Sequence, residues 1–342
     1  MDAGKVSENI LKLSILNQLH TKNEDVICGA GIGTDCALFL PSDDKVLAVC
    51  AAEAAVAIQA DMGDFDTLRY TMAQLVIKCV NNLAASGASP VSAIITLLLP
   101  ESAQHSDIRL LMSQADEACR EFSMQIAGGQ SRVIKGTDVP IAVVNGYGTA
   151  PENCFRTVKM AKPGQDIVLS KWAALEGTAI IARREKDRLN KYYPAYLADT
   201  AVCFDRYLSV MPEAQIALKN GVSAMHDASE GGIFAALWEL AEGAGIGLDI
   251  DIRRLPLRQE TVEICECCGI NPYELLSGGC LVMTADDGES LVRALREGDI
   301  PAVVIGRTTA DNARIIRNED EVRYMDRPKQ DEIYGIFNRH CE

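Results

Sequence analysis

The sequence has no apolar run that approaches the ~20 residues a membrane-spanning helix needs. Its first residues, Met1 to Lys5, lack the basic and apolar regions of a signal peptide. Aromatic residues make up only 5% of a chain that is 48% hydrophobic, so we expect a core of aliphatic side chains. These absences argue against a membrane partner and predict a soluble, cytoplasmic protein.

Basic residues are also scarce. The 33 lysines and arginines face 48 acidic residues, and the formal net charge is −15. Because nucleic-acid binding needs a concentrated basic face, this balance argues against DNA or RNA as a partner. It does not exclude a small anion held by backbone N–H groups.

The twelve cysteines lack the pairing that a zinc site needs. The Cys265–Cys268 cluster has C-x-C-C spacing, without a second pair or a nearby histidine. Reduced, buried thiols are the favoured interpretation, with a metal or thiol carrier as the weaker alternative. A nucleophile with a histidine base has little support, because only His226 of the four histidines lies at a glycine-rich junction.

The order of apolar patterns predicts two domains of mixed character, α+β and α/β, over residues 1–155 and 160–325, with a tail at 326–342. Apolar residues at steps of three and four predict a helix over Leu68–Leu83, ended by Ser86-Gly87. Arg183–Pro194 reads as a charged surface segment, and a strand at 301–306 is expected to complete the second domain.

The segment Ala224–Gly232 lies between a predicted strand and a predicted helix. Asp227 and Glu230 have the spacing of a capping box at the start of that helix. The pair Gly231-Gly232 either offers N–H groups to an anion at the helix start or lets the helix pack closely on the sheet. The sequence leaves both interpretations open.

Three further segments have the same ambiguity. The glycine-rich loop Gly29–Asp35 fails the dinucleotide fingerprint, because a strand follows it where a helix is required. Asn81-Asn82 lies near the end of a buried helix, and Gly128-Gly129 follows a predicted strand. Each is either a ligand contact or an ordinary helix end or turn.

Taken together, the chain resembles the AIR synthetase (PurM-like) superfamily, and within it the HypE-type hydrogenase maturation proteins and their uncharacterised clostridial relatives. The segments that carry the resemblance are Gly31–Ala37, Asn81–Pro90, Gly128-Gly129, Lys162–Gly164, Lys171–Ala179 and His226–Gly232.

The resemblance implies a PurM-like two-domain fold. The N-terminal mixed sheet would pair with a second copy in a dimeric barrel, and the C-terminal α/β domain would flank it. It further implies ATP with Mg2+ in the cleft, used to activate an amide-type or acyl oxygen. In HypE proteins the acceptor is a carbamoyl group on a C-terminal cysteine, and other maturation proteins are partners.

Carried over residue by residue, the resemblance implies Asp35 as a catalytic and metal-binding residue and Glu53 as a metal ligand. Cys341, although penultimate here, is the candidate carrier thiol. The implied nucleotide-binding residues are Gly33, Asn81, Asn82, Gly128, Gly129, Arg132, Asp227, Gly231 and Gly232.

Several positions depart from the family pattern. Thr34 replaces an acidic neighbour of Asp35, Asn81-Asn82 replaces an Asn-Asp pair, and Gln130–Arg132 lacks the acidic residue expected after the glycine pair. Losing carboxylates should weaken Mg2+ binding, since hard cations prefer carboxylate oxygens. Two hypotheses follow: an ATP-dependent HypE-like enzyme, or a catalytically degenerate dimer that binds a nucleotide, another anion or a partner.

Overall fold

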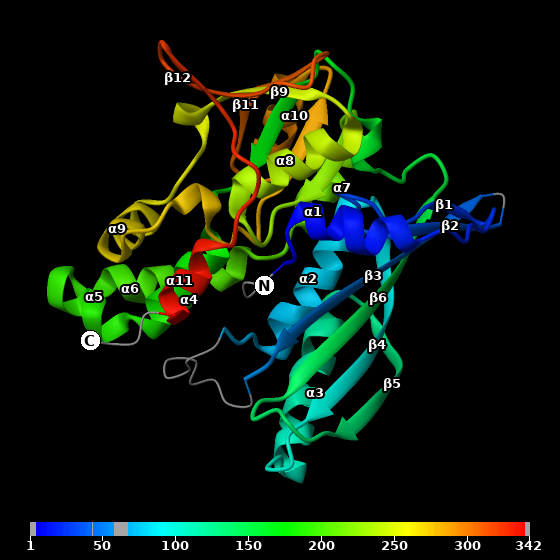
Figure 1. The fold of residues 1–342 in the computed structure, drawn as a ribbon, viewed down its shortest axis with the longest axis vertical. Helices are drawn as coiled ribbons and strands as arrows, with labels where there is room; N and C mark the ends of the chain where they lie inside the picture. The colour runs from blue at the N-terminus through cyan, green and yellow to red at the C-terminus, as the bar shows by residue number, and fades with distance from the viewer. Residues whose placement is uncertain (1–4, 43, 58–67, 339–342) are drawn as a thin grey trace.

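The computed structural model describes residues 5–42, 44–57 and 68–338, and two β-sheets follow one another along the chain (Figure 1). None of the described helices has the length and apolar character needed to cross a membrane. The first sheet has six strands in the order β1 (Val26–Cys28), β2 (Ala37–Ser42), β3 (Lys45–Ala55), β6 (Ile141–Pro151), β4 (Ser89–Leu99) and β5 (Gln125–Val133).

In this first sheet β4 and β5 run parallel and the other neighbouring strands antiparallel, which is the mixed sheet expected from the sequence. Along most of β3, β4 and β6 every second residue is buried. Helices α2 (Met72–Ala85) and α3 (His105–Glu121) supply the core on that side, while the alternate residues of the opposite face are half-exposed.

Helix α2 confirms the helix predicted from periodicity, although it begins four residues after Leu68. Thr71 caps it, because the Thr71 hydroxyl accepts from the Gln74 N–H and the Gln74 side chain accepts from the Thr71 N–H. Its last residue is Ala85, Ser86 is the C-cap, and Gly87 follows with φ +78°. A Cβ at Gly87 would lie 2.4 Å from the Cys154 carbonyl oxygen, so only glycine fits there.

The second sheet has seven strands in the order β13 (Glu321–Tyr324), β12 (Arg314–Asn318), β9 (Gly247–Asp251), β11 (Ala302–Thr309), β7 (Asp166–Ser170), β10 (Leu281–Ala285) and β8 (Val222–Asp227). Helix α8 (Gly232–Ala244) packs on one face, and α7 (Met211–Lys219) and α10 (Gly288–Glu297) pack on the other. This three-layer arrangement confirms the predicted C-terminal α/β domain.

A separate helical layer packs beside the second sheet, around Tyr70 and Phe204. Its helices are α4 (Leu175–Arg184), α5 (Lys186–Tyr192), α6 (Ala195–Val202), α9 (Gln259–Cys268) and α11 (Glu332–Asn338). The interpretation of Arg183–Pro194 as a plain surface segment was therefore incomplete, because α5 lies within it. Leu189 is the one buried residue of α5. A single buried residue makes no periodic apolar pattern, so the sequence could not reveal this helix.

Two further expectations are corrected. The strand expected at 301–306 is not the last element of the second domain, since β12 and β13 add a charged hairpin to the sheet within residues 160–325. The predicted capping box is absent, because Asp227 ends β8 and α8 begins only at Gly232. Gly231, with φ +86°, is the residue at the N-cap, and no side-chain capping bond is made there.

Asn81 joins the two domains. Its side chain is 2% exposed, its Nδ2 donates to the Leu208 carbonyl oxygen at 2.8 Å, and its Oδ1 accepts from the Val210 N–H at 3.0 Å. The amide of Asn81 is thus committed to the backbone of the second domain. This gives the buried asparagine at the end of α2 a positioning role.

We expect Asn81→Ala to lower the free energy of unfolding by about 2 kcal/mol, because it leaves two buried backbone groups without partners. Urea unfolding monitored by circular dichroism measures the change. Asn190→Ala, at an exposed position of α5, is the control and should change stability by less than about 0.5 kcal/mol. Equal losses in the two variants would contradict the bridging role.

Candidate functional site

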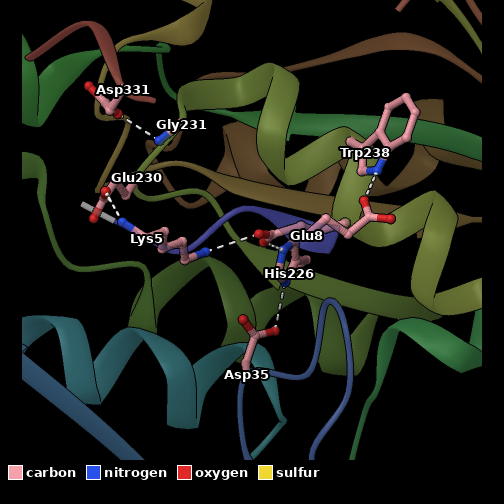
Figure 2. Close-up of polar contacts among 9 residues, drawn as sticks. Lys5, Glu8, Asp35, His226, Glu230, Gly231, Trp238 and Asp331 are labelled. Carbon is pink, nitrogen blue, oxygen red and sulfur yellow. Dashed lines mark hydrogen bonds and ion pairs between the residues drawn. The ribbon is translucent and has the colours of Figure 1, made fainter. Parts of the chain in front are cut away.

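Charged side chains from both domains meet where β8 ends and α8 begins (Figure 2). The N-terminal segment and the loop before β2 reach the same place. We call this group the interdomain cluster. Its members are Lys5, Asp35, Glu53, Lys78, Glu176, His226, Asp227, Glu230 and Glu239.

His226 lies at the centre of the cluster and is 3% exposed. Its Nδ1 lies 2.9 Å from Asp35 Oδ2, and its Nε2 lies 3.1 Å from Glu239 Oε2. Burial alone would lower the pKa of His226, but the two carboxylates outweigh it and raise the pKa to about 10. His226 is therefore an imidazolium that donates from both nitrogens and ties Asp35 of the first domain to α8 of the second.

Lys5 extends this chain of charges. Its Nζ lies 3.0 Å from Glu239 Oε1, and its backbone N–H donates to Glu230 Oε1 at 2.7 Å (Figure 2). Although burial opposes ionisation of Glu239, Lys5 and His226 lower its pKa to about 2. The N-terminal segment also contacts α8 further along, where Trp238 Nε1 donates to Glu8 Oε2 at 2.5 Å.

Asp227 is 6% exposed, and its Oδ1 has no hydrogen-bond partner among the described residues. Burial raises its pKa well above the ordinary value, and the negative charge of Asp35 acts in the same direction. A buried carboxylate oxygen without a partner is costly, so it calls for a ligand, a proton or a water molecule.

Glu176 and Lys78 form an ion pair across the domain boundary. Glu176, on α4, is 2% exposed, and its Oε1 lies 3.3 Å from Lys78 Nζ on α2. The Lys78 ammonium also lies 4.4 Å from the centre of the Tyr70 ring. Glu176 Oε2 would lie 2.3 Å from a Cβ at Gly278, whose backbone N–H donates to the Glu176 carboxylate. Any larger residue at Gly278 would displace this carboxylate.

Packing explains two of the glycines that the resemblance implies as nucleotide-binding residues. A Cβ at Gly33 would lie 2.5 Å from the Glu239 carbonyl oxygen, and one at Gly232 would lie 2.4 Å from the Tyr273 carbonyl oxygen. The Gly231 N–H donates to Asp331 Oδ2 at 2.6 Å (Figure 2). Close packing therefore explains Gly33 and Gly232, and an internal carboxylate holds the amide of Gly231.

Gly128, Gly129 and Arg132 lie on the edge strand β5. The register aligns Gly129 with Ile95, Val144 and then Ala52 of β3. Three strand spacings separate β5 from β3, about 14 Å. Within one subunit these residues are not brought together with Asp35. A Cβ at Gly129 would also lie 2.0 Å from the Ile95 carbonyl oxygen, which explains that glycine by packing.

Asn82 and Glu53 lie nearer the cluster. The Asn82 carbonyl oxygen accepts from Cys36 Sγ at 3.2 Å, which places it one residue from Asp35. Glu53 is exposed but interacts electrostatically with Glu230 and Lys78, and partial desolvation raises its pKa. Cys341 lies outside the described residues. The roles assigned to these residues from the resemblance stay predictions.

Lys5, Lys78, Glu176 and Glu239 are members of the cluster that the sequence did not single out. Glu176 falls inside the matching segment Lys171–Ala179, which is the one signal that could have drawn attention to it. Among the residues that the structure describes, no group of three or more His, Cys, Asp or Glu side chains forms a metal cage.

We expect Glu239→Gln to lower stability at pH 7 by about 2 kcal/mol, because His226 and Lys5 lose a shared carboxylate. Since the pKa of Glu239 is depressed from 4.5 to about 2 in the folded state, its contribution is complete above pH 4.5. It disappears as the pH falls toward 2. The stability difference between wild type and variant should narrow over that range.

Urea titrations at several pH values, with the exposed Glu117→Gln on α3 as control, measure this difference. A gap between wild type and Glu239→Gln that is the same at pH 3 as at pH 7 would contradict the assignment.

Comparisons with known proteins agree with this two-domain arrangement. Residues 33–150 match the family model described as AIR synthase related protein, N-terminal domain, and residues 162–317 match its C-terminal domain. A putative hydrogenase expression/formation protein of Methanocaldococcus jannaschii is 26% identical over 317 residues, covering 92% of this chain and 90% of that protein. The carbamoyl dehydratase HypE of Rhodobacter capsulatus is 29% identical over 245 residues, covering 70% and 69%.

Solved structures share the fold. The crystal structure of a HypE–HypF complex aligns with a TM-score of 0.71 at 19% identity, covering 93% of this chain and 99% of that one. The structure of the hydrogenase maturation protein HypE in complex with ATP aligns with a TM-score of 0.70 at 18% identity, covering 97% and 98%. With both domain models matched in order, the chain belongs to the AIR synthase related protein family and is HypE-like within it.

Proposed function

We propose that this protein binds ATP with Mg2+ between its two domains and uses it to activate a carbamoyl or related acyl group. The observation that carries the proposal is the interdomain cluster, in which Asp35 and His226-Asp227, from two matching segments far apart in the chain, meet across the domain boundary. The relative named carbamoyl dehydratase and the HypE structure with ATP support the chemistry and the nucleotide.

The donor set suits this nucleotide and its cation. Mg2+ prefers carboxylate oxygens and usually binds through one or two of them together with phosphates and water. Bound Mg2+ would neutralise phosphate charge during phosphoryl transfer. The buried oxygen of Asp227 without a partner fits such a cation, and we assign Asp35 and Glu53 to the same purpose. His226 orients Asp35 through its Nδ1, and Lys78 would contribute a positive charge near the phosphates.

We propose that the protein acts as a homodimer in the cytoplasm. The half-exposed face of the first sheet carries apolar side chains at alternate positions, which are Leu47, Val49, Ile94, Leu98, Ile141, Val143 and Tyr147. A second copy packed on this face would bury them. The distance of Gly129 and Arg132 from Asp35 within one subunit supports a site completed by the partner. Other maturation proteins are proposed partners, as the HypE–HypF structure suggests.

A second candidate function is that of a catalytically inactive scaffold. Its supporting observation is Asp331, whose carboxylate accepts from the N–H groups of Gly231, Leu276 and Ile333 and so holds a donor expected to face a phosphate. The replacement of family carboxylates at Thr34, Asn82 and Gln130–Arg132 also favours a scaffold without Mg2+. Such a protein would bind a nucleotide or another anion without Mg2+. In either case Cys341 stays a proposed carrier thiol.

Calorimetric titration with ATP and Mg2+, followed by phosphate release with a carbamoylated cysteine peptide, tests the main proposal. Wild type should bind, and Asp35→Asn should weaken binding at least about tenfold, because a buried carboxylate beside His226 is lost. Asp199→Asn, exposed on α6, is the control. No heat and no phosphate release with any carbamoylated acceptor would count against an enzyme, and binding unaffected by EDTA would favour the scaffold.

Sedimentation velocity tests the dimer. Wild type should sediment at twice the chain mass, and Val143→Lys, which introduces a charge on the apolar sheet face, should sediment as a monomer. Val262 on α9 is an equally apolar side chain and is 39% exposed. Val262→Lys is therefore the control, and this variant should stay dimeric. A monomeric wild type would contradict the proposed homodimer.

A further inference from the structure

We infer that Cys36 and Cys50 form an oxidisable thiol pair, which a peroxide converts to a disulfide and which thereby changes the position of Asp35. Both cysteines are free, buried thiols of the first domain, and neither has a role in the proposed function. The formation of the disulfide does not rest on the proposed function, whereas its effect on nucleotide binding does.

The first support is the register of β2 and β3. These strands run antiparallel, with Ala37 opposite Val49. One step further in the same register, Cys36 falls opposite Cys50. Residues directly opposite each other in an antiparallel pair have Cα atoms about 4.5–5.5 Å apart, and a disulfide needs about 4.4–6.8 Å. The backbone therefore already holds the two cysteines at a separation that a disulfide can bridge.

The second support is that both side chains reach the same place against α2. The Cys36 thiol donates to the Asn82 carbonyl oxygen at 3.2 Å, and Cys50 Sγ lies 3.4 Å from the Cys79 carbonyl oxygen, one turn earlier on that helix. The Cys36 and Cys50 thiols also hydrogen-bond to each other. A Cβ at Gly146 would lie 3.1 Å from Cys50 Sγ, so this glycine leaves room for the sulfur atoms.

The third support is that the two thiols are unequal. The hydrogen bond from Cys36 lowers the pKa of Cys50, and the Cys79 thiol and the Asn82 side chain act in the same direction. Burial raises the pKa of Cys36 well above its ordinary value, so Cys36 keeps its proton. Cys50 is therefore the nucleophilic sulfur, and Cys36 is the sulfur that completes the disulfide.

Exposure selects the same two thiols. Cys36 and Cys50 are 4% and 7% exposed, so solvent and a molecule as small as hydrogen peroxide reach them. Cys79 is 0% exposed, and its thiol donates to the Val144 carbonyl oxygen at 3.0 Å. Cys79 is thus left out of the first step, although it contacts Cys50.

The oxidation balances with a peroxide as the only co-reactant. The Cys50 thiolate attacks one peroxide oxygen, the O–O bond breaks, and the hydroxide that leaves takes up a proton, so that Cys50 becomes a sulfenic acid. The Cys36 sulfur then attacks the Cys50 sulfur, the S–O bond breaks, and the proton of Cys36 leaves with the hydroxide as water. Counted from two thiols, the pair loses two electrons and two protons, and the peroxide is reduced to two waters.

The disulfide acts on Asp35 because Cys36 is the next residue in the chain. In the reduced form Asp35 Oδ2 lies 2.9 Å from His226 Nδ1. A bond to Cys50 draws the Cys36 sulfur away from the Asn82 carbonyl oxygen and shifts the peptide that carries Asp35. Oxidation should therefore weaken the contact with His226, and with it nucleotide binding at the domain boundary.

Peroxide treatment of the wild-type protein, followed by tandem mass spectrometry, tests the thiol pair. Trypsin leaves Cys28 and Cys36 on one peptide and Cys50 on another, so fragmentation must locate the link. We expect a disulfide between Cys36 and Cys50 that a dithiol reductant removes. A disulfide from Cys50 to Cys28 or Cys79 instead, or no disulfide at Cys50, would overturn the inference.

Serine variants test the two roles. Cys36→Ser should stop at the sulfenic acid of Cys50, which dimedone traps, and Cys50→Ser should leave Cys36 unoxidised. Cys28→Ser is the matched control, because Cys28 is a similarly buried thiol on the same peptide, and it should form the disulfide as wild type does. Dimedone trapped on Cys36 in Cys50→Ser would overturn the assignment of the nucleophile. The mapping on wild type remains decisive if a variant folds poorly.

Calorimetric titration with ATP and Mg2+ then compares reduced and oxidised wild type. Oxidation should weaken binding at least about fivefold, and Cys50→Ser should lose this response to peroxide. Equal binding by the two wild-type forms would overturn the effect on Asp35. Absence of binding in both forms would reject the proposed nucleotide, whereas the mapped disulfide would still support the thiol pair.

Discussion

The contact of His226 with Asp35 and Glu239 is the interaction on which the site depends. The imidazolium lies between a carboxylate of the first domain and one on α8, and Lys5 adds the N-terminal segment to the same chain of charges. Because all of these groups are held by one another, the domain boundary has a fixed geometry at the point where the matching segments meet. Asn81 fixes the same boundary through backbone groups of the second domain.

Much of the fold could be predicted from the sequence, because local patterns carry it. The periodicity of Leu75, Cys79 and Leu83 predicts α2, and Gly87 marks its end. Helix α5 was not predicted, because a short charged helix with one buried side chain has no periodic apolar pattern. For the site, Asp35 and Asp227 came from motifs, whereas His226 was weighed only as a histidine base with little support. The pairing of Lys78 with Glu176 was not predicted, since it depends on two domains that only the folded chain brings together.

The glycines show where a sequence pattern leaves two physical causes open. Gly33, Gly129 and Gly232 each lie where a Cβ would overlap a backbone carbonyl oxygen, so packing alone requires them. The carboxylates show the opposite case. The buried Asp227 Oδ1 has no hydrogen-bond partner among the described residues, and packing does not explain that cost.

A crystal structure with Mn2+ and a non-hydrolysable ATP analogue, with anomalous data collected at the manganese edge, tests this account most directly. The account predicts an anomalous peak beside Asp35 and Asp227 at the domain boundary, with the nucleotide phosphates next to that peak. A nucleotide bound elsewhere, or manganese bound away from the interdomain cluster, would contradict it.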